Sequence, residues 1–574
     1  MTGEQLFFNA IQNYPDLQGQ QVNLYKCFLP QAWYFAEASG ISAFVHPNGV
    51  FDDPNAGILR KTMFGKLMKS FRFLNKELMF ADVSTSREFS LNVYGNEATD
   101  SFDVIANLVD TATIEDCYDQ SCQHKLYGLK DDNNNWCHTG HPDRVITIGK
   151  KELELFAKLF DDSDEWEQAR LPVIHAKTLT DILFCFENQS MTLGSIRDKL
   201  HPTEMWDETG SKNNGTIAKH EHFPSEAVSM IYSGAHIGVA NPLFKTSRRN
   251  CDSRYDFDPI DLEIVPDVFL QRCKYEVACS KAEYLERMQT TCWDNAYYSN
   301  YRVASRRMLN LSGERTLMSA IIPPMTGHIN TVYGLAFKEK SDCLLVGGLM
   351  SSLPFDLFIK MLGKADAKFS SLALLPYIND KPWADLIRNR SKLLNCLTQY
   401  YGDLWDTPSE IATIDMWSKT DTRLNNSAFS NLNNKWCKDS PLRSDYARRQ
   451  ALVEIDVLTA LSLGMSFEQL KNAYRIMFPI LQNIEDDTWY DANGRIVFTS
   501  STNLPGVGYD RKEWEGNVKG AMDGMVFTRE IEDDTMPGGP VKRTVEYVAP
   551  FDKCDREQDY ETAWRFFEEK YGKE

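Results

Sequence analysis

The first hundred residues alternate between helix-like and strand-like patterns, and this order constrains the fold more than any other feature of the chain. Apolar residues recur at helical spacing over residues 22–38 and 59–75, and the second of these segments is rich in Lys and Arg. Short apolar or alternating runs predict strands over residues 41–45, 78–83 and 89–93. An order of helix, buried strand, helix and further strands is typical of a layered α/β unit.

The usual beginning of a cofactor-binding α/β domain is missing from this unit. Such a domain normally starts with a strand, a Gly-rich turn and a helix, because the turn lets backbone N–H groups approach a nucleotide. Residues 1–40 contain no strand followed by a Gly-rich turn. The chain therefore opens at what looks like the second half of a doubly wound domain.

The rest of the chain is irregular until its last quarter. Residues 97–445 contain short strand signals among many Asn, Asp, Gly and Pro residues, without a repeat of fixed period. Residues 446–463 then predict an amphipathic helix, and Ser466 with Gln469 forms a capping box for a second helix. The Asn-Gly pair at residues 493–494 lies between two strand-like runs and predicts a β-hairpin.

Composition indicates an ordinary folded protein. Of the 574 residues, 43% are hydrophobic and 25% are charged, which is enough for several domains, each with its own core. The 13 cysteines are an odd number spread along the chain, which favours reduced thiols over a disulfide framework. No apolar run is long enough for a membrane span, and the first residues lack the features of an export signal. We therefore predict a cytoplasmic protein without a membrane partner.

Charge limits how this chain could bind double-stranded DNA. Its 62 Lys and Arg residues against 81 Asp and Glu residues give a net charge of −19, so a DNA contact must come from a local basic face. Basic residues interleaved with aromatic residues, as recognition of phosphates and bases requires, occur in two segments. The predicted DNA-contact residues are Lys245, Arg248, Arg249, Tyr301, Arg302, Arg306 and Arg307.

The basic residues also have structural interpretations. A solvated face, in which the cations pair with neighbouring acids, is the alternative to a DNA-contact role. Arg315 is predicted to be a scaffold residue, because Glu314 lies beside it and an apolar run follows.

Two segments partly match the loop with which amino-methyltransferases hold a flipped base. Residues 101–107 end a strand-like run with Asn107 but lack a following proline, and residues 239–244 carry Asn241 with one proline of the two. Neither segment lies downstream of a cofactor loop. Because apolar strands often end in an Asn that enters a turn, we predict no catalytic residue in this chain.

A group of thiols and imidazoles within residues 117–141 has part of the composition of a zinc site. Its members include Cys117, Cys122, His124 and Cys137. The spacing departs from the tight C-x₂-C pairs of structural zinc sites, so thiols that pack as small apolar groups are the preferred interpretation and zinc is the alternative.

Two longer segments carry the most specific signal in the chain. Residues 312–331 and 451–508 resemble the C-terminal half of large adenine-N6 DNA methylases of bacterial phage defence, namely the type IIG restriction-modification family and the related DISARM and BREX methylases. Supporting matches occur at residues 169–172, 205–209, 238–245 and 301–304.

The resemblance implies a chain without its own catalytic motifs. In that family the first half carries the S-adenosylmethionine loop and the Asn-Pro-Pro-Tyr loop, and the second half recognises the target. Residues 22–93 look like the strands that follow the catalytic loop, so S-adenosylmethionine is expected on a separate methyltransferase chain rather than on this one. A half-domain would also expose a sheet edge and an apolar face, which need cover.

The expected fold is a mixture of α/β and α+β structure, in which a partial doubly wound methyltransferase lobe is followed by an irregular recognition region and a helical C-terminal region. The expected domains are residues 1–96 for the end of the methyltransferase lobe, 97–330 for DNA target recognition, 331–445 for a second recognition or connecting region, and 446–574 for a helical hairpin, a β-hairpin and a tail.

The resemblance favours the DNA-recognition subunit of a split adenine-specific methyltransferase over two other classes. A stand-alone DNA-binding accessory protein of a defence system, without methylation activity, is the main alternative. An acidic DNA mimic is disfavoured by the clustered arginines. The resemblance to half of the family's chain is expected both for a naturally split gene and for a truncated one.

Overall fold

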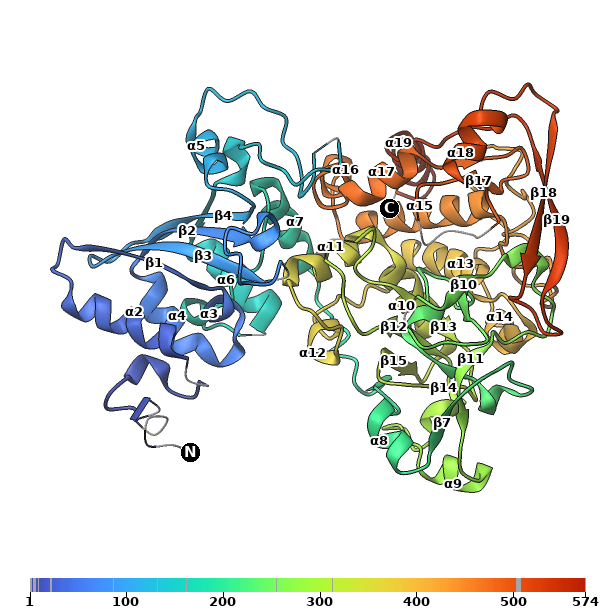
Figure 1. Cartoon of the computed structure of the whole chain (residues 1–574), viewed down its shortest axis with the longest axis horizontal. Coiled ribbons are helices and arrows are strands. Elements are labelled where there is room, and N and C mark those ends of the chain that lie inside the picture. The colour runs from blue at the N-terminus through green and yellow to red at the C-terminus, as the bar shows by residue number, and fades with distance from the viewer. Residues whose placement is uncertain are drawn as a thin grey trace. The chain divides into compact units, whose positions relative to one another are not determined.

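The computed structural model divides the chain into two compact units, which are described separately here (Figure 1). It describes residues 3, 7–8, 10–20, 23–85, 87–131, 133–161, 163–253, 255–311, 313–501 and 507–572. The first unit comprises residues 1–190, 361–363 and 472–480, and the second comprises residues 191–360, 364–471 and 481–574. Both units combine helices with sheets, so the mixed α/β fold class predicted from the sequence is confirmed.

The first unit is built around one five-stranded sheet with the order β1-β3-β2-β4-β5. Strand β3 is antiparallel to both β1 and β2, β2 and β4 are parallel, and β4 and β5 are antiparallel. The strands are β1 (Ile41–Pro47), β2 (Leu67–Leu74), β3 (Glu88–Gly95), β4 (Ser101–Leu108) and β5 (Ile146–Gly149). The helices are α2 (Leu24–Phe35), α3 (Gly49–Asp52), α4 (Gly57–Phe64), α5 (Ala112–Tyr118), α6 (Lys150–Phe156) and α7 (Lys177–Glu187). The sheet thus continues past residue 96, the expected end of the lobe, through β4 and β5.

Two of the predicted elements in this unit are wrong. The helix predicted over residues 59–75 ends at Phe64, and β2 follows as an inner strand of the sheet. Phe71 and Phe73 of β2 are buried in one core cluster, and four consecutive residues of this strand are buried. Because both faces of an inner strand are buried, its sequence lacks the alternation of apolar and polar residues that distinguishes a strand from a helix. Residues 78–83 form a loop because the Asn75 side chain bonds to the backbone of Phe80 and Val83.

The second unit contains a four-stranded sheet with the order β13-β12-β15-β6 and several two-stranded sheets. Its strands are β6 (Leu200–Thr203), β7 (Ile217–His222), β8 (Ile231–Tyr232), β9 (Lys245–Ser247), β10 (Phe257–Pro259), β11 (Cys273–Val277), β12 (Arg302–Arg306), β13 (Ser319–Ile322), β14 (Gly327–His328), β15 (Val332–Phe337), β16 (Trp489–Tyr490), β17 (Ile496–Phe498), β18 (Val526–Asp533) and β19 (Val541–Val548).

Helices cover the four-stranded sheet in successive layers. The buried helix α10 contacts β12, β13 and β15 and also packs on α13, α13 packs on α15, and α15 packs on α19. The helices of this part of the chain are α8 (Glu208–Asn213), α9 (Lys281–Glu286), α10 (Lys340–Ser351), α11 (Leu353–Leu362), α12 (Phe369–Leu372), α13 (Trp383–Asn395), α14 (Gly402–Trp405), α15 (Asp445–Ser462), α16 (Phe467–Met477), α17 (Pro479–Asp486), α18 (Arg511–Glu513) and α19 (Arg556–Tyr571).

Buried ion pairs join these helices to one another. Arg390 of α13 contacts Asp415 at 3.1 Å and Glu454 of α15 at 2.7 Å, and all three side chains are inaccessible to solvent. Arg556 of α19 contacts Asp456 of α15 at 2.7 Å. Removing one partner of a buried pair typically costs about 3–5 kcal/mol, because the other charge stays buried without compensation. Helix α15 is therefore fixed on two sides by charge as well as by packing.

The local sequence signals after residue 445 are confirmed. Helix α15 ends before Gly464, which adopts a φ of 73°, and Ser466 and Gln469 bond reciprocally to one another's backbone N–H groups. The Asn493-Gly494 turn connects β16 to β17, with Gly494 at a φ of 88°. Side chains that prefer positive φ or cap a helix act locally, which is why these signals could be read from sequence.

Among the described residues, no single helix has the length and hydropathy to cross a membrane. Taken together, α10 and α11 are long and apolar enough to cross a membrane, but the two helices are bent by 68° relative to one another. The residues of α10 are largely buried against the sheet and α13, as expected of a core helix.

Candidate functional site

Lys245, Arg248 and Arg249 lie around β9, which pairs with the antiparallel strand β10. Arg248 is exposed and donates to Asp258 at 2.9 Å. Arg249 is also exposed, and its guanidinium contacts both carboxylate oxygens of Asp534 at 2.9 and 3.0 Å. Each carboxylate occupies a position where a phosphate oxygen would bind, so a DNA contact here requires exchange of one anion for the other.

Phe244 brings Lys245 and Arg306 together, although they come from different strands. The Lys245 ammonium lies 5.2 Å and the Arg306 guanidinium 5.4 Å from the centre of the Phe244 ring. Arg306 also donates to the carbonyl of Ile237 at 2.7 Å, and burial lowers its pKa to about 10. Arg306 is thus anchored within the protein more firmly than a surface arginine would be.

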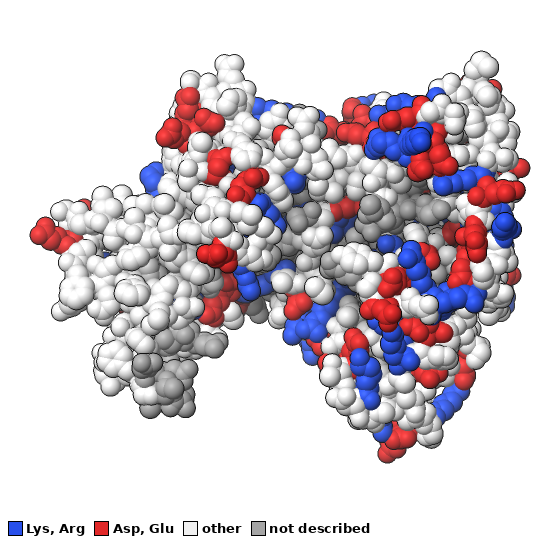
Figure 2. All heavy atoms as spheres, viewed as in Figure 1, with Lys and Arg blue, Asp and Glu red and all other residues white. Residues whose placement is uncertain are grey.

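Arg307 is partly exposed and already paired with acids. It lies 3.5 Å from Glu204 and 3.8 Å from Asp366. On the visible face of the second unit, Lys and Arg side chains are intermixed with Asp and Glu side chains (Figure 2). The structure therefore has the pairing of cations with acids that was the alternative to a DNA-contact role at Arg248, Arg249 and Arg307.

Tyr301 and Arg302 are buried. Arg302 has no exposed surface and donates to the carbonyls of Pro323 at 2.6 Å and Thr326 at 2.8 Å. The Tyr301 hydroxyl donates to the carbonyl of Tyr400 at 3.0 Å. Both side chains therefore hold the fold, and neither presents a polar group to a phosphate in this structure. A sequence pattern of basic and aromatic residues is the same whether the residues form internal contacts or lie on the surface.

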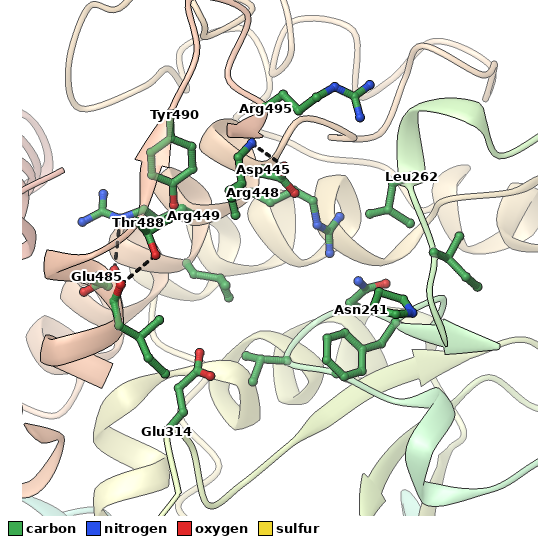
Figure 3. Close-up of a pocket in the computed structure, with 18 of the residues that line it drawn as sticks. Asn241, Leu262, Glu314, Asp445, Arg448, Arg449, Glu485, Thr488, Tyr490 and Arg495 are labelled. Atoms are coloured by element: carbon green, nitrogen blue, oxygen red, sulfur yellow. Dashed lines mark hydrogen bonds and ion pairs between the residues drawn. The ribbon is translucent and has the colours of Figure 1, made fainter. Parts of the chain in front are cut away.

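A pocket with a volume of about 210 Å³ lies within the second unit (Figure 3). It is formed by the loop before β9, the segment from β10 to residue 263, the segment before β13, the first turns of α15, helix α17, strands β16 and β17, and the start of α19. These segments are far apart in the sequence. Apolar side chains form much of its wall, namely Val239, Phe244, Ile260, Leu262, Met318, Leu452, Leu481, Ile484, Ile496 and Val507.

The arginines that line this pocket all have partners in the protein. Four of them pair with carboxylates, namely Arg315 with Asp356, Arg449 with Glu485 and Asp559, Arg495 with Asp261 and Glu263, and Arg556 with Asp456 and Glu485. Arg443 donates to four backbone carbonyls and Arg448 to three. The scaffold role predicted for Arg315 is confirmed, since its guanidinium is buried and bonds to α11 and to the end of α10.

Two carboxyl groups of the pocket differ from these paired groups. Among the described residues, Glu314 forms neither a hydrogen bond nor an ion pair, and burial raises its pKa while Arg315 lowers it. Asp445 accepts one hydrogen bond, at 2.9 Å from the Ile496 N–H. Burial, together with the neighbouring acid Asp261, raises the pKa of the Asp445 carboxyl to about 7. Sequence reasoning missed both groups as site residues, because nothing local distinguishes them from other surface acids.

The two loops considered for amine binding form ordinary turns. Asn241 accepts from the N–H of Leu243, and the carbonyl of Ala240 is held by Arg448. Asn107 adopts a φ of 58°, and its side chain contacts His175 at 3.3 Å. Asn241 is nevertheless a lining residue of the pocket.

The thiol and imidazole cluster forms no metal-binding arrangement among the described residues. There, no group of three or more His, Cys, Asp and Glu side chains is placed to hold a metal ion. Cys117 and Cys137 are buried, and the Cys122 thiol bonds to the carbonyl of Gly140.

Comparisons with known proteins give matches in structure alone. No protein-family model matches the chain, and no curated protein matches its sequence. It is similar to the type IIL restriction-modification enzyme MmeI, solved in complex with DNA, at 9% identity and a TM-score of 0.36, over 82% of this chain and 55% of that one. It is also similar to the type IIG restriction endonuclease BpuSI, at 10% identity and a TM-score of 0.23, over 80% of this chain and 51% of that one. The chain thus spans about half the length of these solved structures, and at these TM-scores a shared fold is not established.

Proposed function

We propose that this protein is the DNA-recognition part of a split adenine-specific DNA methyltransferase, in a restriction-modification or phage-defence system such as DISARM or BREX. A separate chain, bearing the S-adenosylmethionine loop and the Asn-Pro-Pro-Tyr motif, would complete it in the cytoplasm. The sequence resemblance over residues 312–331 and 451–508 motivates the proposal. An uncovered surface of the first unit is the structural observation that carries it.

That surface, called here the α2–β1 surface, consists of exposed apolar side chains on α2 and β1. Its residues are Leu24, Phe28, Tyr34, Phe35, Ile41 and Val45, with exposed fractions from 53% for Val45 to 81% for Tyr34. Figure 2 shows few charged side chains on the visible face of this unit. Because His46 of β1 stacks on Tyr25 of α2 and strand side chains alternate, Ile41 and Val45 point to the face of the sheet opposite α2. The exposed residues therefore form two neighbouring apolar patches, one on α2 and one on β1, and such patches are typical of a binding surface.

The sheet edge points to the same kind of partner. Among the described strands, β1 pairs with β3 alone and forms one edge of the sheet. Strands β1, β2 and β4 run in the same direction, so a further parallel strand beside β1 would continue a doubly wound sheet. Open edges of this kind are normally covered or paired. We therefore infer that the partner chain adds its sheet at β1 and covers α2.

The proposed DNA contacts follow from accessibility. Arg248 and Arg249 are the exposed candidates. Lys245 lies on β9 just before them, Arg306 at the end of β12 shares the Phe244 ring with Lys245, and Arg307 follows Arg306. Tyr301 and Arg302 leave the proposed contact set because they are buried. The surface arginines would exchange Asp258 and Asp534 for backbone phosphates.

Co-expression with methyltransferase chains encoded beside this protein tests the proposal. We expect a chain with both catalytic motifs to co-purify, and the pair to transfer methyl groups to adenine in DNA. Phe28→Asp combined with Phe35→Asp should abolish co-purification, whereas Met522→Asp, at an exposed apolar residue of the second unit, should leave it intact. A chain that purifies alone and binds DNA unaided would instead support the stand-alone accessory function.

A further inference from the structure

The pocket in the second unit retains hydrogen-bonding groups that the fold does not use. Its arginines are occupied by carboxylates or carbonyls, as described above. Three of the unused groups are acceptors: the Glu314 carboxylate, one carboxylate oxygen of Asp445 and the Tyr490 hydroxyl have no hydrogen-bond partner among the described residues. One unused group is a donor, the Nη2 of Arg449, whose other guanidinium nitrogens pair with Glu485 and Asp559. Tyr490 is buried, whereas Glu314 and Asp445 are half-buried and line the pocket, where a ligand or water can supply the missing hydrogen bonds.

These groups surround the interior of the pocket. Glu314 extends from the segment before β13 on one side, and Asp445 and Tyr490 come from α15 and β16 on the other side (Figure 3). Apolar side chains, among them the Phe244 ring, also line the pocket. A concave apolar surface with a few polar groups directed inward is typical of a small-molecule site.

Acceptors outnumber donors among the unused groups, and this determines the chemistry of the ligand. Two carboxylates and a hydroxyl accept hydrogen bonds, and the carboxylates attract positive charge. An anion would instead meet two carboxylates, and the arginines of the wall already donate to carboxylates or backbone carbonyls, so phosphate and carboxylate ligands are disfavoured. A pocket of about 210 Å³ holds a body the size of one or two small rings.

We propose that this pocket binds a compact organic cation, in which an amidinium or ammonium group on an apolar ring contacts Glu314 and the ring packs against Phe244. Asp445 and Tyr490 would accept further hydrogen bonds from the opposite side. This site is separate from the proposed DNA contacts, and the inference does not depend on methyltransferase activity.

Benzamidine is a suitable probe, because it combines an amidinium with a flat apolar ring. Benzamide has the same shape without the charge, and benzoate has the opposite charge. Titration of the full chain with each compound at pH 8, followed by calorimetry, should show benzamidine binding at least tenfold more tightly than benzamide. Benzoate should show no binding. Charge-assisted hydrogen bonds are roughly twice as strong as neutral ones, which is the basis for this order.

Two variants locate the binding site. Glu314→Gln should weaken benzamidine binding at least tenfold, and Tyr490→Phe should weaken it several-fold by removing one acceptor. Glu568→Gln, at an exposed position of α19, is the matched control and should leave the affinity unchanged. Thermal unfolding of each variant confirms that it is folded, and Tyr490→Phe provides a second test if Glu314→Gln is not. Equal binding of benzamide and benzamidine, no binding of benzamidine, or unchanged affinity in both folded variants would overturn the proposal.

Discussion

Asp445 should make the stability of the second unit depend on pH. Its carboxyl lies in the pocket wall at the start of α15, and burial raises its pKa from the ordinary 3.8 to about 7. The charged groups facing it are Asp261, Glu263, Arg448 and Arg495. Because the folded protein holds this proton more tightly than the unfolded chain does, the contribution of Asp445 to stability is greatest at low pH and is lost as pH rises from about 4 to about 7.

The size of this effect follows from the two pKa values. One pKa unit corresponds to about 1.36 kcal/mol, so ionisation of Asp445 costs the folded state about 4 kcal/mol above pH 7. A negative charge in the first turn of a helix is favoured by about 0.3–1 kcal/mol, which is smaller than the cost of burial. The cost of burying the carboxylate is therefore the larger effect, and ionisation of Asp445 destabilises the folded state.

Asp445→Asn removes this titration and keeps an oxygen that can accept from the Ile496 N–H. Relative to the wild type, the free energy of unfolding of this variant should rise by about 3 kcal/mol between pH 5 and pH 8.5. Urea unfolding followed by tryptophan fluorescence measures this quantity, because nine of the twelve tryptophans lie in the second unit. The transition of this unit has to be resolved from that of the first.

Asp523→Asn, at an exposed aspartate in the turn before β18, is the control and should leave the pH profile as it is. The reasoning fails if the wild type and Asp445→Asn keep the same difference in unfolding free energy across this pH range. It also fails if that difference shrinks as pH rises.

Three further predictions concern the arginines. Arg390→Ala should destabilise the second unit by about 3–5 kcal/mol, because it leaves Asp415 and its neighbouring acid buried without a counter-ion; a loss below 1 kcal/mol in urea unfolding would contradict this. Arg248→Ala with Arg249→Ala should weaken DNA binding with little change in melting temperature, and should lower the slope of log K against log salt by about 2 in filter-binding assays; an unchanged slope would remove both from the DNA contacts. Arg306→Ala should lower the melting temperature measurably, because the Arg306 guanidinium donates to a backbone carbonyl. An unchanged melting temperature would show that the fold does not need this contact.

The elements that could be predicted from sequence are those whose signals are local. A capping box at Ser466 and Gln469 and the Asn493-Gly494 turn act within a few residues, so their outcome does not depend on distant packing. Strand β2 depends on burial between β3 and β4, and this context converts a helix-like pattern into a strand. Its neighbours in the sheet could not be known from the segment itself.

The candidate sites were harder to predict, for the same reason. Arg302 and Arg248 have identical side chains in similarly basic segments, yet one is buried against backbone carbonyls and the other lies in solvent. The pocket brings together Glu314, Asp445 and Tyr490 from three separated segments, and their common property is a side-chain oxygen without a hydrogen-bond partner among the described residues. Missing partners are a property of the folded state, and no sequence motif encodes them.

The charge network around α15 also bears on the order in which the protein can be made. Asp456 has its counter-ion in Arg556, which lies at the beginning of the final described helix, and Glu485 pairs both with Arg556 and with Arg449 of α15. While the ribosome is still synthesising the preceding residues, these acids have no cation from α19, and burying them would be costly. The helical layer of the second unit therefore completes its packing only after α19 has emerged, so premature termination before residue 556 leaves a nascent chain that must keep α15 hydrated.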